Sequence, residues 1–341
     1  MTVFRGNLNR SGVYSTHGIS RLQGIKWRFK TGGEIFSSPA LVDDWVYFGS
    51  TDGYCYGLDL RTGSERWRAH TARQGGVTPA VHGDTLYCEG ASGLYALSRV
   101  TGHERGYWSE QPYGANSPCV VDGTLYYGTV FGLRAIDLDT GKQRWLCGTS
   151  GWVIAPPAFA EHNLYLGSFD HRLYAVEVSS GRVLWTFETG WHIANSPAAQ
   201  DGMVYVSSED RYVYALDWDT GKVIWKYHTE DIPTGFCVTD TGVFFGIWNQ
   251  RVLALDRWSG REQWRFVTHN RLPSTPSIAQ EVLYVGDGDF EKSEGWVYAL
   301  DWRTGEERWS VQLGGGVRSF LTVHKGILYF GSDDSHLYAL Q

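Results

Sequence analysis

The pattern that decides the fold is written most fully in residues 196–225, SPAAQDGMVYVSSEDRYVYALDWDTGKVIW. A Ser-Pro pair opens it, the turn Asp201-Gly202 follows, and two short apolar runs come next at 204–206 and 213–216. Trp225 stands four residues after the glycine of a Thr-Gly turn and ends the unit. Short runs rich in Val, Tyr, Leu and Trp that Gly, Asp and Asn separate are typical of β-strands and tight turns, and no segment shows a helical period.

The same unit recurs along the whole chain at intervals of 37 to 45 residues. Self-similarity at such a period is the sequence signature of a repeat architecture. The repeated tryptophans are Trp27, Trp67, Trp108, Trp145, Trp185, Trp225, Trp264 and Trp309. An independent series of aromatic residues after an apolar one gives the same count: Tyr47, Tyr87, Tyr126, Tyr165, Tyr205, Phe244, Tyr284 and Tyr329.

A repeat of about 40 residues with four short strands is the blade of a β-propeller. Eight copies therefore predict an all-β, eight-bladed β-propeller with four antiparallel strands per blade, as one domain over residues 1–341. The first tryptophan, Trp27, has no strands of its own before it, and the last copy, 319–340, has no tryptophan strand after it. We therefore expect residues 1–30 to lead into the ring and to supply the strand that completes the last blade. Closure of this kind removes exposed sheet edges.

Composition excludes several classes of protein. The 341 residues carry 30 basic and 37 acidic side chains, a net charge of −7, and no run of Lys or Arg exceeds two, so we expect no nucleic-acid partner. No apolar run approaches the length of a membrane span, so we expect no membrane insertion. The first residues, MTVFRGNLNRSG, lack the apolar core of a signal peptide. As written, the chain is expected to be a cytoplasmic monomer, or extracytoplasmic if a signal peptide has been trimmed.

The five cysteines are an odd number and occupy core positions of the repeat. Sister repeats carry small or apolar residues at the same places, which predicts free buried thiols. No Cys-x-x-Cys or adjacent pair indicates a metal or redox site. They are Cys55, Cys88, Cys119, Cys147 and Cys237.

The segments 4–13, 27–33 and 38–40, with the recurring Tyr-Ala-Leu-Asp-x-x-Thr-Gly-x-x-x-Trp, resemble the PQQ-like (quinoprotein-type) propeller repeat family. The resemblance covers the whole chain and implies the propeller fold with tryptophans that dock neighbouring blades. The family includes quinone-dependent alcohol and glucose dehydrogenases, a propeller lipoprotein of outer-membrane assembly and sensor domains of kinases. Its alcohol dehydrogenases stack a Cys-Cys disulfide on the quinone. This chain has no Cys-Cys pair and is much shorter, so we expect no pyrroloquinoline quinone and no other cofactor.

The two faces of the predicted ring differ in sequence. Turns between strands 1–2 and 3–4 repeat one short Gly-containing pattern from blade to blade, which leaves little room for a specific pocket. The inter-blade segments and the strand 2–3 loops vary from blade to blade and bring aromatic, acidic and basic side chains to the channel mouth. Such a mixture on a concave surface suits a ligand site. The predicted binding residues are Glu34, Tyr113, Trp152, Trp191, His192, Asp231, Trp248, Arg271 and Arg318.

Function stays open between three hypotheses. The first is a binding or scaffold propeller that recognises a small molecule, a peptide or a protein at this mouth. The second is an enzyme of acid–base lyase, cyclase or hydrolase type, whose candidate catalytic residues are His192, Asp231, Arg318 and Tyr113, with Arg271 as a further anion stabiliser. The third is a quinoprotein oxidoreductase. No metal is expected, although Asp287, Asp289 and Glu291 form an acidic loop with spacing suited to Ca²⁺.

Overall fold

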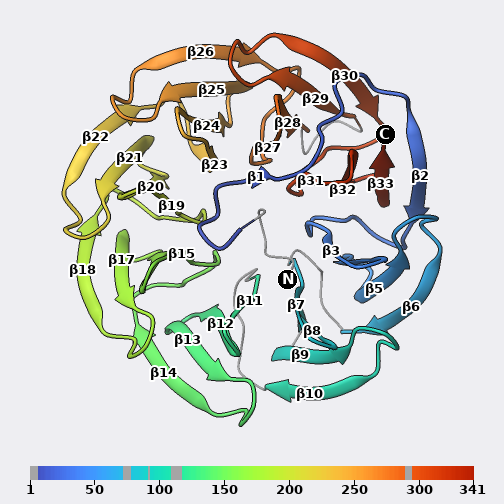
Figure 1. The fold of residues 1–341 in the computed structure, drawn as a ribbon, viewed down its shortest axis with the longest axis horizontal. Helices are drawn as coiled ribbons and strands as arrows, with labels where there is room; N and C mark the ends of the chain where they lie inside the picture. Colours follow the sequence, from blue (N-terminus) through green and yellow to red (C-terminus); the bar gives the residue numbers. More distant parts are fainter. Residues whose placement is uncertain (1–6, 72–77, 91–92, 109–116, 289–293) are drawn as a thin grey trace.

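The computed structural model describes residues 7–71, 78–90, 93–108, 117–288 and 294–341. Every regular element in these residues is a strand. The strands form eight sheets arranged in a ring, as Figure 1 shows, so the predicted eight-bladed β-propeller is confirmed. Within each blade the strands lie side by side, with the first strand next to the central channel and the fourth at the outer rim.

Blades 1 to 4 each contain four strands in sequence order. Blade 1 is β3 (Ala40–Val42), β4 (Trp45–Gly49), β5 (Tyr54–Asp59) and β6 (Glu65–His70). Blade 2 is β7 (Ala80–His82), β8 (Thr85–Gly90), β9 (Gly93–Ser98) and β10 (Glu104–Trp108). Blade 3 is β11 (Cys119–Val121), β12 (Thr124–Thr129), β13 (Gly132–Asp137) and β14 (Gln143–Gly148). Blade 4 is β15 (Ala158–Ala160), β16 (Asn163–Gly167), β17 (Arg172–Glu177) and β18 (Val183–Glu188).

Blades 5 to 8 complete the ring, and the last two take in N-terminal strands. Blade 5 is β19 (Ala198–Gln200), β20 (Met203–Ser208), β21 (Tyr212–Asp217) and β22 (Val223–His228). Blade 6 is β23 (Pro233–Val238), β24 (Gly242–Ile247), β25 (Arg251–Asp256) and β26 (Glu262–Val267). Blade 7 is β27 (Ser277–Ala279), β28 (Val282–Gly286), β29 (Gly295–Asp301) and β30 (Glu307–Leu313), with β1 (Val13–Tyr14) beside β27. Blade 8 is β31 (Thr322–His324), β32 (Ile327–Gly331), β33 (His336–Leu340) and β2 (Ile25–Lys30).

Burial along a blade follows from the stacking of neighbours on both sides. The second strand of blade 5, β20, is buried at every position because blades 4 and 6 cover its two faces. The outermost strand, β22, alternates between exposed and covered residues, since only one face meets the neighbouring blade. Continuous apolar runs in inner strands and alternation in outer strands are the expected result.

The ring closes as the sequence predicts. Strand β2 pairs antiparallel with β33, with Trp27 opposite Ala339 and Phe29 opposite Leu337. Strands from the two ends of the chain thus share blade 8, and no edge is left open there.

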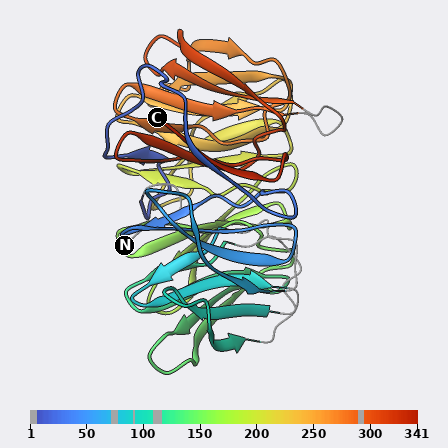
Figure 2. The ribbon, with the colours of Figure 1, turned by 90° about the vertical axis from the view of Figure 1, so that its right-hand side faces the viewer.

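Residues 7–19, which we call the strap, run along the inner edge of the ring ahead of the first blade. Backbone carbonyls of the strap accept hydrogen bonds from the innermost strands of four successive blades. The pairs are Leu8 with Phe159 (2.9 Å), Asn9 with Ala199 (2.9 Å), Ser11 with Val238 (2.8 Å) and Gly12 with Ile278 (3.0 Å). The Arg10 side chain is fully buried and its Nε donates to the Pro157 carbonyl at 3.0 Å. Figure 2 shows the ring edge-on, as a flat disc of blades.

Tryptophans dock neighbouring blades together through one repeated contact. Each indole Nε1 donates to a backbone carbonyl of the next blade, or of the strap, at 2.8 to 3.1 Å. The pairs are Trp27–Leu60, Trp67–Arg99, Trp145–Val178, Trp185–Trp218, Trp225–Arg257, Trp264–Trp302 and Trp309–Ile19. Trp145 and Trp225 are 8% exposed, as predicted, whereas Trp185 and Trp264, which we expected to be equally buried, are only half-buried.

Blade 2 departs from this pattern. Gly106 lies opposite Ala96, in the register that Trp145 occupies opposite Ala135, and Trp108 lies two residues further on, opposite Leu94. The docking tryptophan of blade 2 is therefore replaced by glycine. Trp108 follows the turn glycine Gly102 by six residues, where sister tryptophans follow theirs by four, because a glycine stands in the docking register. The glycine that would receive the ring, Gly141, has no described atom within 4 Å of the place a Cβ would take.

All five cysteines are buried and free, as expected. Burial raises the pKa of Cys119 and raises the pKa of Cys147 to about 11. The pKa of Cys88 is raised chiefly by its hydrogen bond to Cys55, which lies across the boundary between blades 1 and 2.

Candidate functional site at the channel mouth

We call the face that carries the inter-blade segments and strand 2–3 loops the mouth face, and the other the turn face. On the mouth face, in blade 1 and in blades 4 to 8, the strand 2–3 loop is tied by a backbone hydrogen bond to the inter-blade segment before it. Phe169 N–H donates to the Trp152 carbonyl at 2.9 Å, and Glu209 N–H donates to the His192 carbonyl at 3.0 Å. Candidate side chains on these segments therefore project from a hydrogen-bonded scaffold.

An aspartate in most of these loops strengthens the same tie. Asp210 accepts from Gly190 N–H at 2.8 Å and from the Tyr214 hydroxyl at 2.7 Å. Equivalent carboxylate–tyrosine pairs are Asp52–Tyr56, Asp170–Tyr174, Asp287–Tyr298 and Asp334–Tyr338. Asp287, the acidic residue considered for Ca²⁺, is wholly buried in such a pair, and its oxygens also accept from the backbone N–H groups of Asn270 and Trp296. Its partners Asp289 and Glu291 lie outside the described residues.

Five rings from the segments around blade 4 form a continuous surface that we call the aromatic ridge: Trp152, Phe169, His171, Trp191 and His192. Phe169 stacks between Trp152 (centroids 6.1 Å apart) and His192 (4.7 Å). His171 stacks on Trp191 at 5.2 Å and meets His192 edge-on at 4.9 Å. Trp152 and Trp191 remain 46% and 51% exposed. Exposed aromatic rings held in fixed positions are suited to contact a ligand or a partner.

His192 is held as part of the ridge. Its Nδ1 lies 2.7 Å from the Phe169 carbonyl, an acceptor, so this nitrogen carries the proton and the ring donates.

Three other predicted residues line one cavity between blades 6 and 7. Asp231, Trp248 and Arg271 surround a space of about 410 Å³ together with Asn249 and Gln250. The Asp231 carboxylate is oriented by the N–H of Ile232 at 2.8 Å. Opposite charges beside an aromatic ring would orient a ligand that carries both a cationic and an anionic group.

A third cluster lies where blade 8 meets blade 1. Arg318 forms an ion pair with Asp333 at 2.8 Å and its guanidinium lies 4.9 Å from the centre of the Phe36 ring. Burial, and secondarily Glu34 and Asp334, raise the pKa of Asp333 to about 6, against the opposing effect of Arg318. Oδ1 of Asp333 is enclosed without a hydrogen-bond partner among the described residues. Glu34 itself is exposed.

The predicted residues therefore do not converge on a single point but fall into three clusters around the mouth. Tyr113, predicted for binding and catalysis, lies outside the described residues. Asp333 was not among the predicted site residues, although the sequence places 333–336 in a strand 2–3 loop at the mouth.

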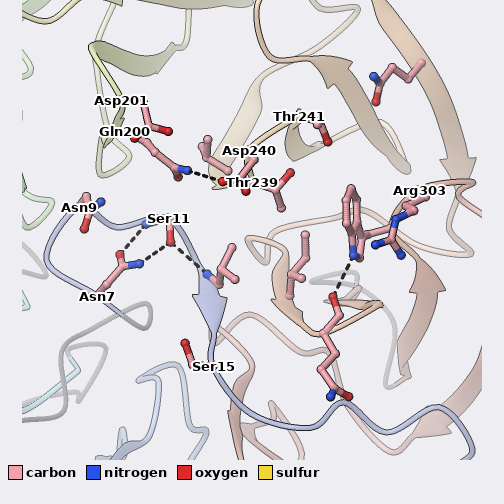
Figure 3. Close-up of a pocket in the computed structure, with 16 residues that line it drawn as sticks. Asn7, Asn9, Ser11, Ser15, Gln200, Asp201, Thr239, Asp240, Thr241 and Arg303 are labelled. Carbon is pink, nitrogen blue, oxygen red and sulfur yellow. Dashed lines mark hydrogen bonds between the residues drawn. The ribbon is translucent and has the colours of Figure 1, made fainter.

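The turn face carries a cavity that the sequence did not indicate. A space of about 1090 Å³ opens between the strap and the turns of blades 5, 6 and 7. Figure 3 shows its lining of amide, hydroxyl and carboxylate side chains. The sequence placed no pocket here because the strap, which forms one wall, binds through backbone atoms.

The described residues contain no group of three or more His, Cys, Asp or Glu side chains placed to hold a metal ion. They also contain no helix long and apolar enough to cross a membrane.

Solved structures of the same architecture differ widely in what they are. BamB from Moraxella catarrhalis superposes with a TM-score of 0.78 at 19% identity, over 94% of this chain and 100% of that one. Quinohemoprotein alcohol dehydrogenase from Comamonas testosteroni superposes with a TM-score of 0.80 at 14% identity, over 99% of this chain and 80% of that one. The computationally designed protein Ika8 superposes with a TM-score of 0.78 at 16% identity, over 91% of this chain and 96% of that one. At these identities the likeness shows the fold alone.

Family membership rests on the sequence. No curated protein matches the chain. The family model described as outer membrane protein assembly factor BamB matches residues 24–146, 131–244 and 249–341, which together span almost the whole propeller. The chain belongs to this family of PQQ-like propeller repeats.

Proposed function

We propose that the protein is a non-catalytic binding propeller that holds an extended, apolar segment of a partner protein against the aromatic ridge. The observation that carries the proposal is the ridge itself, in which Trp152 and Trp191 stay about half exposed while their neighbours fix them in place. Large, rigid aromatic side chains dominate the energy of protein interfaces, and aromatic-lined grooves accept extended, proline-containing segments.

The family supports a protein partner. The matching family model is described as an outer membrane protein assembly factor, and BamB is among the structural neighbours. An assembly factor acts on proteins, which agrees with an exposed aromatic surface more readily than with a small, enclosed pocket.

Quinone chemistry is not part of the proposal, because the residues do not fit the cofactor. The five cysteines are buried and separate, so no disulfide of adjacent cysteines faces the mouth. Arg318, a side chain that could pair with a quinone carboxylate, is already held by Asp333 at 2.8 Å.

The experiment is selection of peptides from a random 12-residue display library on the immobilised protein. Peptides enriched on the wild type should contain proline or aromatic residues and should lose about 30-fold in affinity on the double variant Trp152→Ala, Trp191→Ala, which corresponds to about 2 kcal/mol. Trp258→Ala is the control, since Trp258 is 57% exposed on the turn face. Peptides that bind the double variant as well as the wild type would refute the proposal.

Acid–base catalysis at the same mouth is the second candidate, and the raised pKa of Asp333, about 6, favours it. A carboxyl group that titrates near neutrality beside an arginine can exchange a proton while the arginine stabilises an anion. Any turnover found in a screen of lyase and hydrolase substrates should disappear in Asp333→Asn. The residue pair is then Asp333 and Arg318, in place of the predicted bases His192 and Asp231.

A further inference from the structure

The cavity on the turn face is bordered by an irregular turn in blade 6. In the seven other blades, strands 1 and 2 are joined by two residues of which the first has positive φ, as at Asp201 (φ 45°) in blade 5. In blade 6, β23 ends at Val238 and β24 begins at Gly242, and Asp240 has no positive φ. The Thr239 hydroxyl accepts from the Gly242 N–H at 3.0 Å and holds this irregular turn in place.

The strap supplies the opposite wall. Asn7 and Ser11 are fixed to each other, since the Asn7 side chain accepts from the Ser11 N–H at 2.9 Å. Asn9 lies between them on the strap, and its amide has no hydrogen-bond partner among the described residues. Figure 3 shows Asn9 and Asp240 among the side chains that surround the space.

Most charges around the cavity are already neutralised. Asp201 pairs with the buried guanidinium of Arg257 at 2.9 Å, and Arg303 pairs with Glu281 at 3.2 Å. Asp240 is different, because its described contact is with a neutral amide, Gln200 Nε2, at 3.3 Å. The cavity therefore offers one carboxylate acceptor among amides and hydroxyls.

The floor, by contrast, is apolar. Val13, Val238 and Ile278 line it, and Trp302 stands at one side, held by its Nε1 bond to the Gln280 carbonyl at 2.9 Å. A ligand that fits such a site has apolar C–H surface on one side and groups that both donate and accept hydrogen bonds around its edge. Hydroxyl groups on a ring have this property.

Other classes of ligand fit less well. An anion would meet the unneutralised Asp240. A wholly apolar ligand would cover the amides without replacing their hydrogen bonds to water, which is costly. A dication would find one carboxylate free, since Asp201 is paired.

We propose that the turn-face cavity is a binding site for a neutral saccharide, with Asp240 accepting from ligand hydroxyls and Asn9 hydrogen-bonding on the opposite wall. The volume, about 1090 Å³, lies at the upper end of ordinary ligand pockets and accommodates more than one sugar ring. The site is separate from the aromatic ridge, so it does not depend on the proposed function of the mouth face.

The test is calorimetric and NMR titration of the full chain with maltose, cellobiose and lactose, and with glucuronic acid and glucosamine as charged probes. At least one neutral sugar should bind with a Kd of about 1 mM or tighter. Asp240→Asn should weaken that binding about tenfold, because a charge-assisted hydrogen bond is lost while the shape is kept. Asn9→Ala should weaken it about fivefold, through loss of a neutral hydrogen bond.

The matched control is Asp122→Asn, the same turn position in blade 3, which is exposed and does not line the cavity. It should leave the affinity unchanged, and melting temperatures should verify that all three variants fold. The proposal is overturned if no neutral sugar saturates the protein, if only a charged probe binds, or if Asp240→Asn binds as tightly as the wild type.

Discussion

Blade 2 offers a direct test of what the docking tryptophans contribute, because its tryptophan, Trp108, packs against Tyr87 (centroids 6.1 Å apart) from outside the docking register, with no described Nε1 bond to blade 3. Gly141 has φ 69° and open space beside it, whereas the equivalent Gly181 lies against the Trp145 ring. Gly106 occupies the tryptophan register, and a Cβ there would meet only Ala96, at 3.9 Å. Gly106→Trp should therefore place an indole between blades 2 and 3.

The expected gain can be worked out from the sister blades. A buried tryptophan removes about 150–250 Å² from water, worth about 4–6 kcal/mol at roughly 25 cal/mol per Å². Compactness of the unfolded chain reduces this by up to about 40%, and ordering the side chain costs about 1 kcal/mol. The new Nε1 bond, to the Leu138 carbonyl by analogy with Trp145 and Val178, adds about 1 kcal/mol. We expect a net stabilisation of about 3 kcal/mol.

Chemical denaturation of wild type, Gly106→Trp and Gly106→Ala measures this gain. The alanine variant measures what is gained merely by removing glycine from a strand, up to about 1 kcal/mol in the free energy of unfolding. Trp145→Gly is the reverse experiment and should cost about 3–5 kcal/mol. If Gly106→Trp is no more stable than Gly106→Ala, the space beside Gly141 is already filled in solution, and the reasoning fails.

Three other predictions test separate parts of the structure. Asp333 has a folded-state pKa of about 6 against 3.8 ordinarily, so its protonated form stabilises the fold below about pH 4 and this stabilisation is lost as pH rises through 6. Urea unfolding should show a loss of about 1 kcal/mol after solvent screening, and Asp333→Asn should remove this pH dependence. The five buried thiols should react with a disulfide reagent at less than about one equivalent in the folded protein and fully after denaturation, because buried thiols ionise poorly; rapid labelling of the native protein would contradict this. Deletion of residues 1–30 removes β2 and the buried Trp27 and should lower the melting temperature by about 10 °C or make the protein insoluble; a deletion variant that melts like the full chain would disprove closure by β2.

The architecture could be predicted because the repeat fixes strand, turn and docking positions eight times over. Closure by β2 followed from counting strands, since Trp27 lacked a blade and the last blade lacked a tryptophan strand. The substitution at Gly106 was harder to see, because Trp108 lies only two residues away and resembles a displaced copy.

The candidate site could be predicted in part. Alternation along a blade assigned the variable loops to one face, and neighbouring segments did bring Trp191 and His192 together with Trp152. The role of Phe169 as the ring between them depends on how two loops meet, which spacing does not give. The ion pair between Arg318 and Asp333 likewise joins an inter-blade segment to a loop, and no sequence pattern predicts it.

The turn-face cavity could not be predicted because the strap has no side-chain periodicity. Its bonds come from carbonyls of Leu8, Asn9, Ser11 and Gly12, and any residue has a carbonyl. The irregular turn at 239–242 was similarly hidden, since its length in sequence equals that of its sisters and only its φ angles and hydrogen bonds differ.

The double use of the N-terminal segment has a consequence for the order of assembly. The strap forms its hydrogen bonds with blades 4 to 7, and β2 pairs with β33, where Trp27 lies opposite Ala339. During synthesis from the N-terminus, β2 must remain unpaired until β33, at the end of the chain, has emerged. Contacts at such sequence separation slow folding, and a growing ring exposes strand edges meanwhile. We therefore expect the N-terminal segment to dock last, locking an already formed arc of blades.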